Sequence, residues 1–459
     1  MNLSLVPSNV PRLAFGALAL LAASACDLEG GANRNQSSPG NMDHGVDLGQ
    51  GNIAVHPRSG SFIARVQGGG TIHGHVDGNW KKLDLEFPER LAFAPKRDVV
   101  YVASQKKGGT LVAYDLKQGE PLWQAKSSLA APPEYDWSFE ESSWPWMQVS
   151  TDDEHLVVIE RRKLDVHSTS DGARLGGWMA PTEIVDVDLS HDGSKAFVVV
   201  DGAEPMQTRF FTLSLPSMER TAIDVPNCAA PLAIEPRGKY GFMAPTRCNA
   251  DPVSVIDLDK GEFVRNLPGF GPVALAGKGR LGVAFVDLAD LDESLFLDTD
   301  PRPEGDRRYH LMLIDTQTLE FEFAELGDTL PRYAPTPDGK LLLLDHDSWY
   351  DDEQVRLFDI ESKTFETLVG PAINLDAFVI TQDSKRAFAL DRGVFELDFA
   401  KAVVSSLPLA LLPTSLNVTP DDAMLLMREE LGPIHVYDIE SRRVVRAVGP
   451  GVDEAPRRN

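Results

Sequence analysis

The chain has 459 residues, of which 42% are hydrophobic and 25% are charged; these ordinary proportions for a folded protein exclude a wholly disordered chain. Its formal net charge is −25, and no basic patch for phosphate contacts is visible, so we expect no nucleic-acid partner. A net negative charge favours solubility and attracts cations or basic partners.

The first 25 residues are predicted to be an export signal rather than part of the fold. Arg12 precedes an apolar run over 13–25 that is too short for a permanent membrane span, and Cys26 follows it. This arrangement resembles a bacterial lipoprotein signal peptide, although Ala23 stands where the usual lipobox has Leu. The resemblance implies that Cys26 is lipidated and that the globular part is periplasmic or extracellular. An ordinary signal peptide with a chance cysteine is the alternative.

Residues 26–50 are rich in Gly, Asn, Ser and Asp, and we predict that they form a flexible tether behind the lipidated cysteine. Residues 451–459 are predicted to be a disordered tail. The folded part is therefore expected to span 51–450.

Within 51–450, one pattern recurs nine times: two short apolar runs around a polar turn, usually followed by a second hairpin. A unit of about 40–45 residues with four short strands is typical of a β-propeller blade. We therefore predict an all-β chain, folded as a single propeller of four-stranded antiparallel blades. The nine turns lie at 56–60, 94–98, 150–153, 190–195, 235–239, 276–280, 336–340, 381–385 and 419–422.

In most units the second hairpin begins with an apolar strand that ends in Asp. The carboxylate can hydrogen-bond the backbone of the turn that it starts, so we interpret these residues as turn formers and not as catalytic acids. They are Asp115, Asp257, Asp315, Asp359, Asp398 and Asp438.

The turn-and-strand segments 190–199 and 336–344 resemble those of WD-repeat-like and YVTN-type propellers of bacterial exported proteins, without the Trp-Asp dipeptide. The resemblance implies a fold and no particular activity. Nine first hairpins but only eight strong second hairpins can be counted, because the segment 71–76 of the first unit is an unusual strand. We expect eight blades within a range of seven to nine, with the first unit irregular or supplying part of the ring closure. The last unit is complete, which argues against closure by a swapped N-terminal strand.

Strand polarity places three unusual segments, 127–145, 285–309 and 345–353, on one rim of the propeller. Long loops on a rigid scaffold commonly carry binding residues, so we predict an acidic and aromatic rim that binds a partner. A solvated surface without a ligand is an open alternative, and the aromatic residues can equally fold their own insertion onto the propeller. The candidate residues are Tyr135, Trp137, Trp144, Asp298, Asp300, Asp345, Asp347, Trp349, Asp351 and Asp352.

Metal ligands are only weakly indicated. Clustered carboxylates make Asp345, Asp347 and Asp351, or the loop 298–306, candidates for calcium, and no other cofactor is expected. His73 and His75 share one face of a strand, which is more typical of packing than of a transition-metal site without a third ligand.

Cys228 and Cys248 flank the first hairpin of the fifth unit, and in an exported protein we expect them to form a disulfide. Two free thiols or a metal pair are the alternatives.

These features predict a monomeric, membrane-anchored propeller of the cell envelope that binds a protein, peptide or glycan through the rim. The alternative is a propeller enzyme resembling lactonases, quinoproteins or phytases, with its site at the mouth of the central channel. That alternative requires convergent polar side chains or metal ligands there, whereas a channel lined by Val, Ala and Leu argues against it. A third possibility is a purely structural spacer.

Overall fold

The computed structural model describes most of the chain from residue 46 to residue 449. The described ranges are 46–47, 53–66, 70–83, 90–104, 109–126, 146–201, 208–226, 231–244, 252–277, 279–328, 330–345, 355–373, 375, 377–409, 411–429 and 432–449. Among these residues, no helix has both the length and the apolar character needed to cross a membrane.

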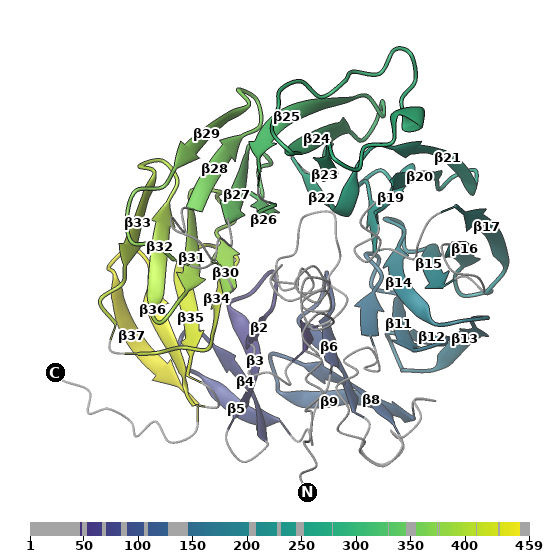
Figure 1. The fold of residues 1–459 in the computed structure, drawn as a ribbon. Coiled ribbons are helices and arrows are strands. Elements are labelled where there is room, and N and C mark those ends of the chain that lie inside the picture. The colour runs from purple at the N-terminus through teal and green to yellow at the C-terminus, as the bar shows by residue number, and fades with distance from the viewer. Residues whose placement is uncertain are drawn as a thin grey trace, which may run out of the picture.

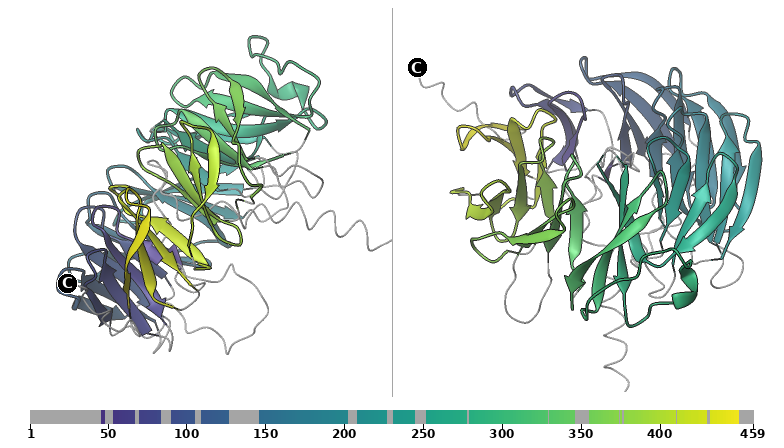
Figure 2. Two further views of the ribbon diagram at one scale, coloured as in Figure 1. Left: turned by 90° about the vertical axis from the view of Figure 1, so that its left-hand side faces the viewer. Right: turned by 90° about the horizontal axis from the view of Figure 1, so that it is seen from above.

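Nine antiparallel sheets follow one another along the chain, each with four strands from one contiguous segment, and the second carries one additional strand. Figure 1 shows them arranged radially in chain order, so that the last sheet lies beside the first. The two further views in Figure 2 show the sheets standing side by side around the same ring. The prediction of one β-propeller with four-stranded blades is confirmed. The preference for eight blades is wrong, because there are nine, which is the upper end of the predicted range.

Each blade contributes an inner strand A, followed outward by strands B, C and D. Blade one is β2 (Ile53–Val55), β3 (Ser61–Val66), β4 (Gly70–His75) and β5 (Trp80–Leu83); blade two is β6 (Arg90–Phe93), β7 (Val99–Ser104), β8 (Thr110–Asp115) and β9 (Glu120–Lys126). Blade three is β10 (Trp146–Val149), β11 (His155–Glu160), β12 (Lys163–Ser168) and β13 (Arg174–Met179); blade four is β14 (Ile184–Leu189), β15 (Lys195–Asp201), β16 (Thr208–Ser214) and β17 (Arg220–Val225). Blade five is β18 (Leu232–Ile234), β19 (Tyr240–Met243), β20 (Val253–Asp257) and β21 (Glu262–Leu267); blade six is β22 (Phe270–Ala276), β23 (Leu281–Asp287), β24 (Tyr309–Asp315) and β25 (Phe321–Gly327).

The remaining blades keep the same order. Blade seven is β26 (Arg332–Pro335), β27 (Leu341–Asp345), β28 (Val355–Asp359) and β29 (Thr364–Thr367); blade eight is β30 (Ala377–Ile380), β31 (Arg386–Leu390), β32 (Val394–Asp398) and β33 (Val403–Ser406). Blade nine is β34 (Ser415–Val418), β35 (Met424–Arg428), β36 (Ile434–Asp438) and β37 (Arg443–Val448). A short strand, β1 (Val46–Asp47), is added to β6, and one 3-10 helix, η3 (Glu293–Leu295), lies between β23 and β24.

The first unit, predicted to be irregular, is a complete blade. Its C strand β4 pairs with both β3 and β5, although it has few aliphatic side chains. The pairing depends on the backbone, and the ring of Phe62 fills the space over Gly74, where an added Cβ would lie 2.5 Å from Phe62 Cζ. The side-chain pattern of β4 is therefore a poor indicator of this strand, whose backbone pairs on both edges.

The ring closes by packing between blade nine and blade one, with each blade contiguous in sequence, and without a strand exchanged between the two ends of the chain. Asn417 on β34 donates a hydrogen bond from Nδ2 to the carbonyl oxygen of Ile53 on β2, at 3.3 Å. The side chains of blade one in this interface are Ile53, Phe62, Ala64 and Ile72, and those of blade nine are Leu426, Ile434, Val436 and Val448. The prediction that the last unit is complete is confirmed.

A side-chain hydroxyl and a carboxylate stabilise the turn between strands A and B. In blade seven, Thr336 donates to Asp338 Oδ1 at 2.7 Å and accepts from the Leu341 N–H at 3.1 Å, while Asp338 accepts from the Lys340 N–H at 3.1 Å. Blades three, four, eight and nine repeat this arrangement with Ser150, Ser190, Thr381 and Thr419. In blade five the single carboxylate of Glu235 accepts from two N–H groups instead.

The predicted turn role of the six Asp residues that end C strands is confirmed. Each accepts main-chain N–H groups two or three residues ahead, as Asp315 does from Gln317 at 2.8 Å and Thr318 at 3.0 Å. The same contacts are made by Asp115, Asp257, Asp359, Asp398 and Asp438.

We expect thermal stability to fall on acidification, and among the groups that contribute, His73 and Asp192 act in two separate steps. Burial lowers the pKa of His73 to about 4, so the folded state binds fewer protons than the unfolded state between about pH 6.5 and 4, and stability is lost as the pH falls through that window. Hydrogen bonds from Ser190 and Ser194 lower the pKa of Asp192 to about 2, so its contribution is lost between about pH 4 and 2. Melting curves should show that His73→Gln reduces only the first step and Asp192→Asn only the second. Equal curves for all three proteins would contradict this assignment.

Candidate functional site

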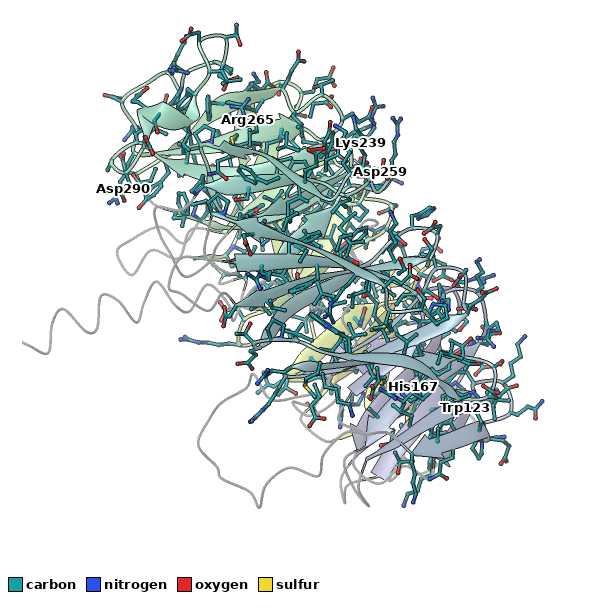
Figure 3. All side chains as sticks on the ribbon, turned by 90° about the vertical axis from the view of Figure 1, so that its right-hand side faces the viewer. Trp123, His167, Lys239, Asp259, Arg265 and Asp290 are labelled. Carbon is teal, nitrogen blue, oxygen red and sulfur yellow. The ribbon has the colours of Figure 1, made fainter. Side chains whose placement is uncertain are left out.

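The two faces of the propeller carry different connections. The A–B and C–D turns leave one face, which we call the turn face, and the B–C loops and the connections between blades leave the other, which we call the loop face. Figure 3 views the molecule from the side: Asp290, in the B–C loop of blade six, lies at one edge, and Lys239 and Asp259, in the turns of blade five, lie at the opposite edge. The predicted polarity of the blades is therefore observed.

Most of the predicted site residues lie outside the described part of the chain. These are Tyr135, Trp137, Trp144, Asp347, Trp349, Asp351 and Asp352, together with Cys26, Cys228 and Cys248. The backbone of Asp345 ends β27 opposite Arg332. Lipidation, the disulfide and the calcium candidates Asp345, Asp347 and Asp351 stay predictions. Asp298 and Asp300 are described, and both lie in the B–C loop of blade six, residues 288–308.

The base of the 288–308 loop is closed by an ion pair. The Arg308 guanidinium donates to both carboxylate oxygens of Asp287, with distances of 3.1 and 3.0 Å from Nε and 2.7 Å from Nη2. The Leu288 N–H donates to the Arg308 carbonyl oxygen at 2.9 Å. The hydrogen bonds to Asp287 raise the pKa of Arg308, whose charge is therefore held. A bidentate pair of this kind fixes direction as well as distance, so the loop leaves the blade at a defined angle.

The middle of the loop is clasped to the neighbouring blade through Asp300. Arg265, on the outer strand β21 of blade five, donates to Asp300 Oδ2 at 2.6 Å and to the Leu295 carbonyl oxygen at 3.3 Å. The Leu297 N–H donates to the same carboxylate oxygen at 2.8 Å. Burial favours the neutral acid, but the bonds from Arg265 and Leu297 outweigh it and lower the pKa of Asp300. The structure thus gives Asp300 an internal role, since its side chain is only 11% exposed.

An aromatic cluster anchors the same loop. The buried Phe296 packs on Phe321 and Phe323 of β25, with ring centroids 6.4 and 6.2 Å apart, and the Arg302 guanidinium lies 4.0 Å from the Phe296 centroid. Sequence reasoning missed this anchor. One signal was available: Phe321 and Phe323 are two residues apart on one strand and therefore share a face, opposite a loop with a single Phe.

Outside these contacts the loop exposes several side chains, of which Glu293 lies 3.6 Å from Arg302. The Leu297 side chain is 56% exposed. The exposed carboxylates are Asp290, Asp292, Glu293 and Asp298, of which Asp292 also accepts from the Ser294 N–H at the start of η3. Within the described ranges, no group of three or more His, Cys, Asp or Glu side chains is placed to hold a metal. The exposed carboxylates make this part of the loop surface negatively charged.

The inner strands, which surround the axis, consist mainly of aliphatic residues. In their described residues they contain no His, Cys or Glu. Their polar residues connect adjacent blades: Gln148 donates to Asp188 Oδ1 at 3.1 Å, and Asp186 accepts from the Leu232 N–H at 2.6 Å.

No known family model matches the chain, and no curated protein matches it. Among solved structures, it is similar to hydrazine synthase of Kuenenia stuttgartiensis, with 17% identity, a TM-score of 0.40, and coverage of 67% of this chain and 95% of that chain. It is also similar to the C-terminal WD40 domain of Sif2, with 11% identity, a TM-score of 0.46, and coverage of 75% and 94%. At these levels the likeness concerns the fold alone, and a WD40 propeller domain is among the similar structures.

Proposed function

We propose that this protein is a membrane-anchored propeller of the bacterial cell envelope that binds a basic protein or peptide through its loop face. The observation that carries the proposal is the 288–308 loop, which is clasped at Asp287 and Asp300 while its other carboxylates point outward. The lipoprotein-like segment ending at Cys26 supports the anchor, and it does so from sequence alone.

A clasped loop is better suited to binding than a mobile one. A partner that meets a preorganised surface does not have to supply the free energy of ordering it, so more of the contact energy becomes affinity. The acidic surface also attracts a basic partner at a distance, which raises the association rate at low salt. The exposed side chain of Leu297 provides an apolar contact among the charged side chains of the loop. A lysine- or arginine-rich segment with an aliphatic residue has the chemistry that complements this loop.

The direct test compares neutralisation of the two faces. The loop-face variant carries Asp290→Asn, Asp292→Asn, Glu293→Gln and Asp298→Asn. The control carries four matched changes at or next to C–D turns, Asp259→Asn, Glu262→Gln, Glu361→Gln and Glu440→Gln. Affinity capture from the native envelope, and binding to an immobilised lysine-rich peptide, should be lost for the loop-face variant and kept for the control. Equal binding by both variants would contradict the proposal.

Releasing the clasp should weaken binding without changing a surface carboxylate. We expect Arg265→Met to reduce affinity for the lysine-rich peptide by about tenfold, equivalent to about 1.4 kcal/mol, because the loop must then be ordered on binding. Lys239→Met on the turn face removes the same charge and is the control. Hydrogen exchange should rise in 288–308 for Arg265→Met. Faster exchange with unchanged affinity would show that ordering of the loop does not contribute to the affinity for the peptide.

A further inference from the structure

The outer strands of blade nine and blade one carry exposed basic residues at the place where the ring closes. Figure 1 shows β37 and β5 as the outermost strands of these two neighbouring sheets. The chain as a whole has a net charge of −25, so this surface has the opposite sign to the whole molecule. We call it the basic wall, and its exposed residues are Trp80, Lys81, Lys82, Arg443, Val444, Val445 and Arg446.

Strand register shows that cations of the two blades face each other. Residues opposite one another in a sheet lie on the same face of that sheet. Arg446 is opposite Val436, and Lys82 is opposite Ile72. Val436 and Ile72 are both buried in the interface between blades nine and one, so Arg446 and Lys82 face this junction from its two sides. The Arg446 side chain reaches blade one, because a Cβ added at Gly78 would lie 3.1 Å from its Nη1.

Two more residues of the basic wall face the same junction. Trp80 is two residues from Lys82 on β5 and shares its face. Arg443 is opposite Asp438, which is two residues from the buried Val436 on β36. The junction is therefore lined by an indole ring and a lysine on one side and by two arginines on the other.

The nearby carboxylates are engaged in their own turns. Asp77 accepts from the Asn79 N–H at 3.0 Å, and Asp438 accepts from the Ser441 N–H at 2.6 Å. Among the residues that the structure describes, Lys82, Arg443 and Arg446 form no ion pair. Several other cations of the outer strands and their turns have carboxylate partners: Arg174 with Asp165, Arg209 with Asp224, Lys363 with Glu322, and Arg442 with Glu396.

The 288–308 loop of blade six has the complementary chemistry. It exposes the apolar side chain of Leu297 among carboxylates. The basic wall exposes Val444 and Val445, each 38% accessible, between Arg443 and Arg446. One surface is therefore negative with an apolar centre, and the other is positive with an apolar centre.

These two surfaces cannot meet within one molecule. Figure 1 shows β23 and β24, which carry the loop, across the ring from β37 and β5. The blades between them are packed sheets, and the wall is fixed by its own blades at the ring closure. Contact between loop and wall therefore requires two copies of the chain.

We propose that two copies of this chain associate, with the 288–308 loop of one copy on the basic wall of the other. The inference rests on the proposed role of the loop as a binding surface, and it identifies a second copy as a partner. Each contact leaves one loop and one wall free, so further copies can add to the pair. The sequence predicts a monomer, and the wall cannot be read from it because blades one and nine lie at opposite ends of the chain.

Salt concentration decides which charges matter in this contact. Two copies with a net charge of −25 each repel one another at long range. At about 0.1 M salt the screening length is about 10 Å, so distant like charges are screened while charges in contact still attract. At about 1 M the screening length falls to about 3 Å, which weakens the contact itself.

Sedimentation velocity of the full mature chain tests the association, with Cys26→Ser in every protein so that no lipid is attached. At about 0.1 M salt, the sedimentation coefficient should rise with protein concentration for the wild type and should stay constant for the loop-face variant and for a wall variant. The wild type should also lose this concentration dependence at about 1 M salt. The wall variant carries Lys82→Gln, Arg443→Gln and Arg446→Gln.

A control variant with the same net charge as the wall variant should associate like the wild type. It removes three exposed cations of blades four and five, through Arg220→Gln, Lys239→Gln and Lys260→Gln. An equal mixture of the wall variant and the loop-face variant should form a dimer and nothing larger, because it offers one intact loop and one intact wall for each pair.

Three results would overturn the proposal. They are a wild type whose sedimentation coefficient does not depend on concentration at about 0.1 M salt, a wall variant that associates like the wild type, and a mixture that stays monomeric or grows beyond the dimer. Binding of the immobilised lysine-rich peptide separates this inference from the proposed function. The wall variant keeps its loop and should bind the peptide like the wild type. Peptide binding by a monomeric wild type would contradict self-association alone, whereas a wild type that does not bind the peptide would contradict the proposed function.

Discussion

Phe62→Ala is expected to destabilise the protein by about 3–5 kcal/mol and to open the ring at one place, between blade nine and blade one. Phe62 is fully buried on β3, and its ring lies over Gly74 and packs in the cluster shared with Leu426 and Val436. Removing the ring loses apolar burial and leaves a cavity that neighbouring blades cannot collapse into, because each is fixed by its other interface.

The matched control for this prediction is Phe242→Ala. Phe242 is also fully buried on a B strand, but it packs between blades five and six. Chemical denaturation should give similar losses of unfolding free energy for the two variants. Hydrogen exchange should differ: we expect increased opening in β2–β5 and β34–β37 for Phe62→Ala only. Faster exchange elsewhere, with the first and last blades unaffected, would contradict the observed packing between blade nine and blade one.

Gly339→Ala is expected to cost considerably more than Gly238→Ala, although both glycines occupy the same position of an A–B turn. Their φ values are nearly equal, +68° and +73°, so a Cβ costs each about 1–2 kcal/mol of backbone strain. The surroundings differ: a Cβ at Gly339 would lie 1.7 Å from the Gly277 nitrogen in blade six, whereas nothing lies within 4 Å at Gly238. Two turn backbones must move apart at Gly339, which adds about 1–3 kcal/mol or more.

Urea unfolding of both glycine variants measures this difference directly. A loss at Gly339→Ala that exceeds the loss at Gly238→Ala by at least about 1 kcal/mol agrees with close contact between the turns of blades six and seven. Equal losses would show that these turns are not in contact in solution.

Much of the fold can be predicted from the sequence because the side chains that form its turns contact residues close to them in sequence. The side chains of Thr336, Asp338 and Asp315 make hydrogen bonds to groups within five residues, so spacing alone identifies these turns. The blade number was misjudged because β4 was assessed by its side chains, whereas Phe62 on the neighbouring strand supplies the packing that β4 lacks. Strand pairing itself depends on the backbone, which all residues except proline share.

The candidate site was also predictable only in part. Its position on the loop face follows from strand alternation, which can be read from the sequence. The contact of Arg265 with Asp300 cannot be predicted in this way, because the two residues are 35 apart and meet only when blades five and six are adjacent. Asp300 and Asp298 look alike in sequence, yet one carboxylate is held by Arg265 and the other is exposed. The pairing of β1 with β6 likewise joins two segments that the whole of blade one separates in sequence.

Radial closure of nine blades is tested most directly by one pair of distances between spin labels at C–D turns. One protein carries Asp77→Cys in blade one and Glu440→Cys in blade nine; the other carries Asp77→Cys and Asp259→Cys in blade five, with native cysteines replaced in both. The closed ring predicts that the blade one to blade nine distance is the shorter, even though those labels are farther apart in sequence. A longer distance from blade one to blade nine than to blade five would show an open array and contradict the closed propeller.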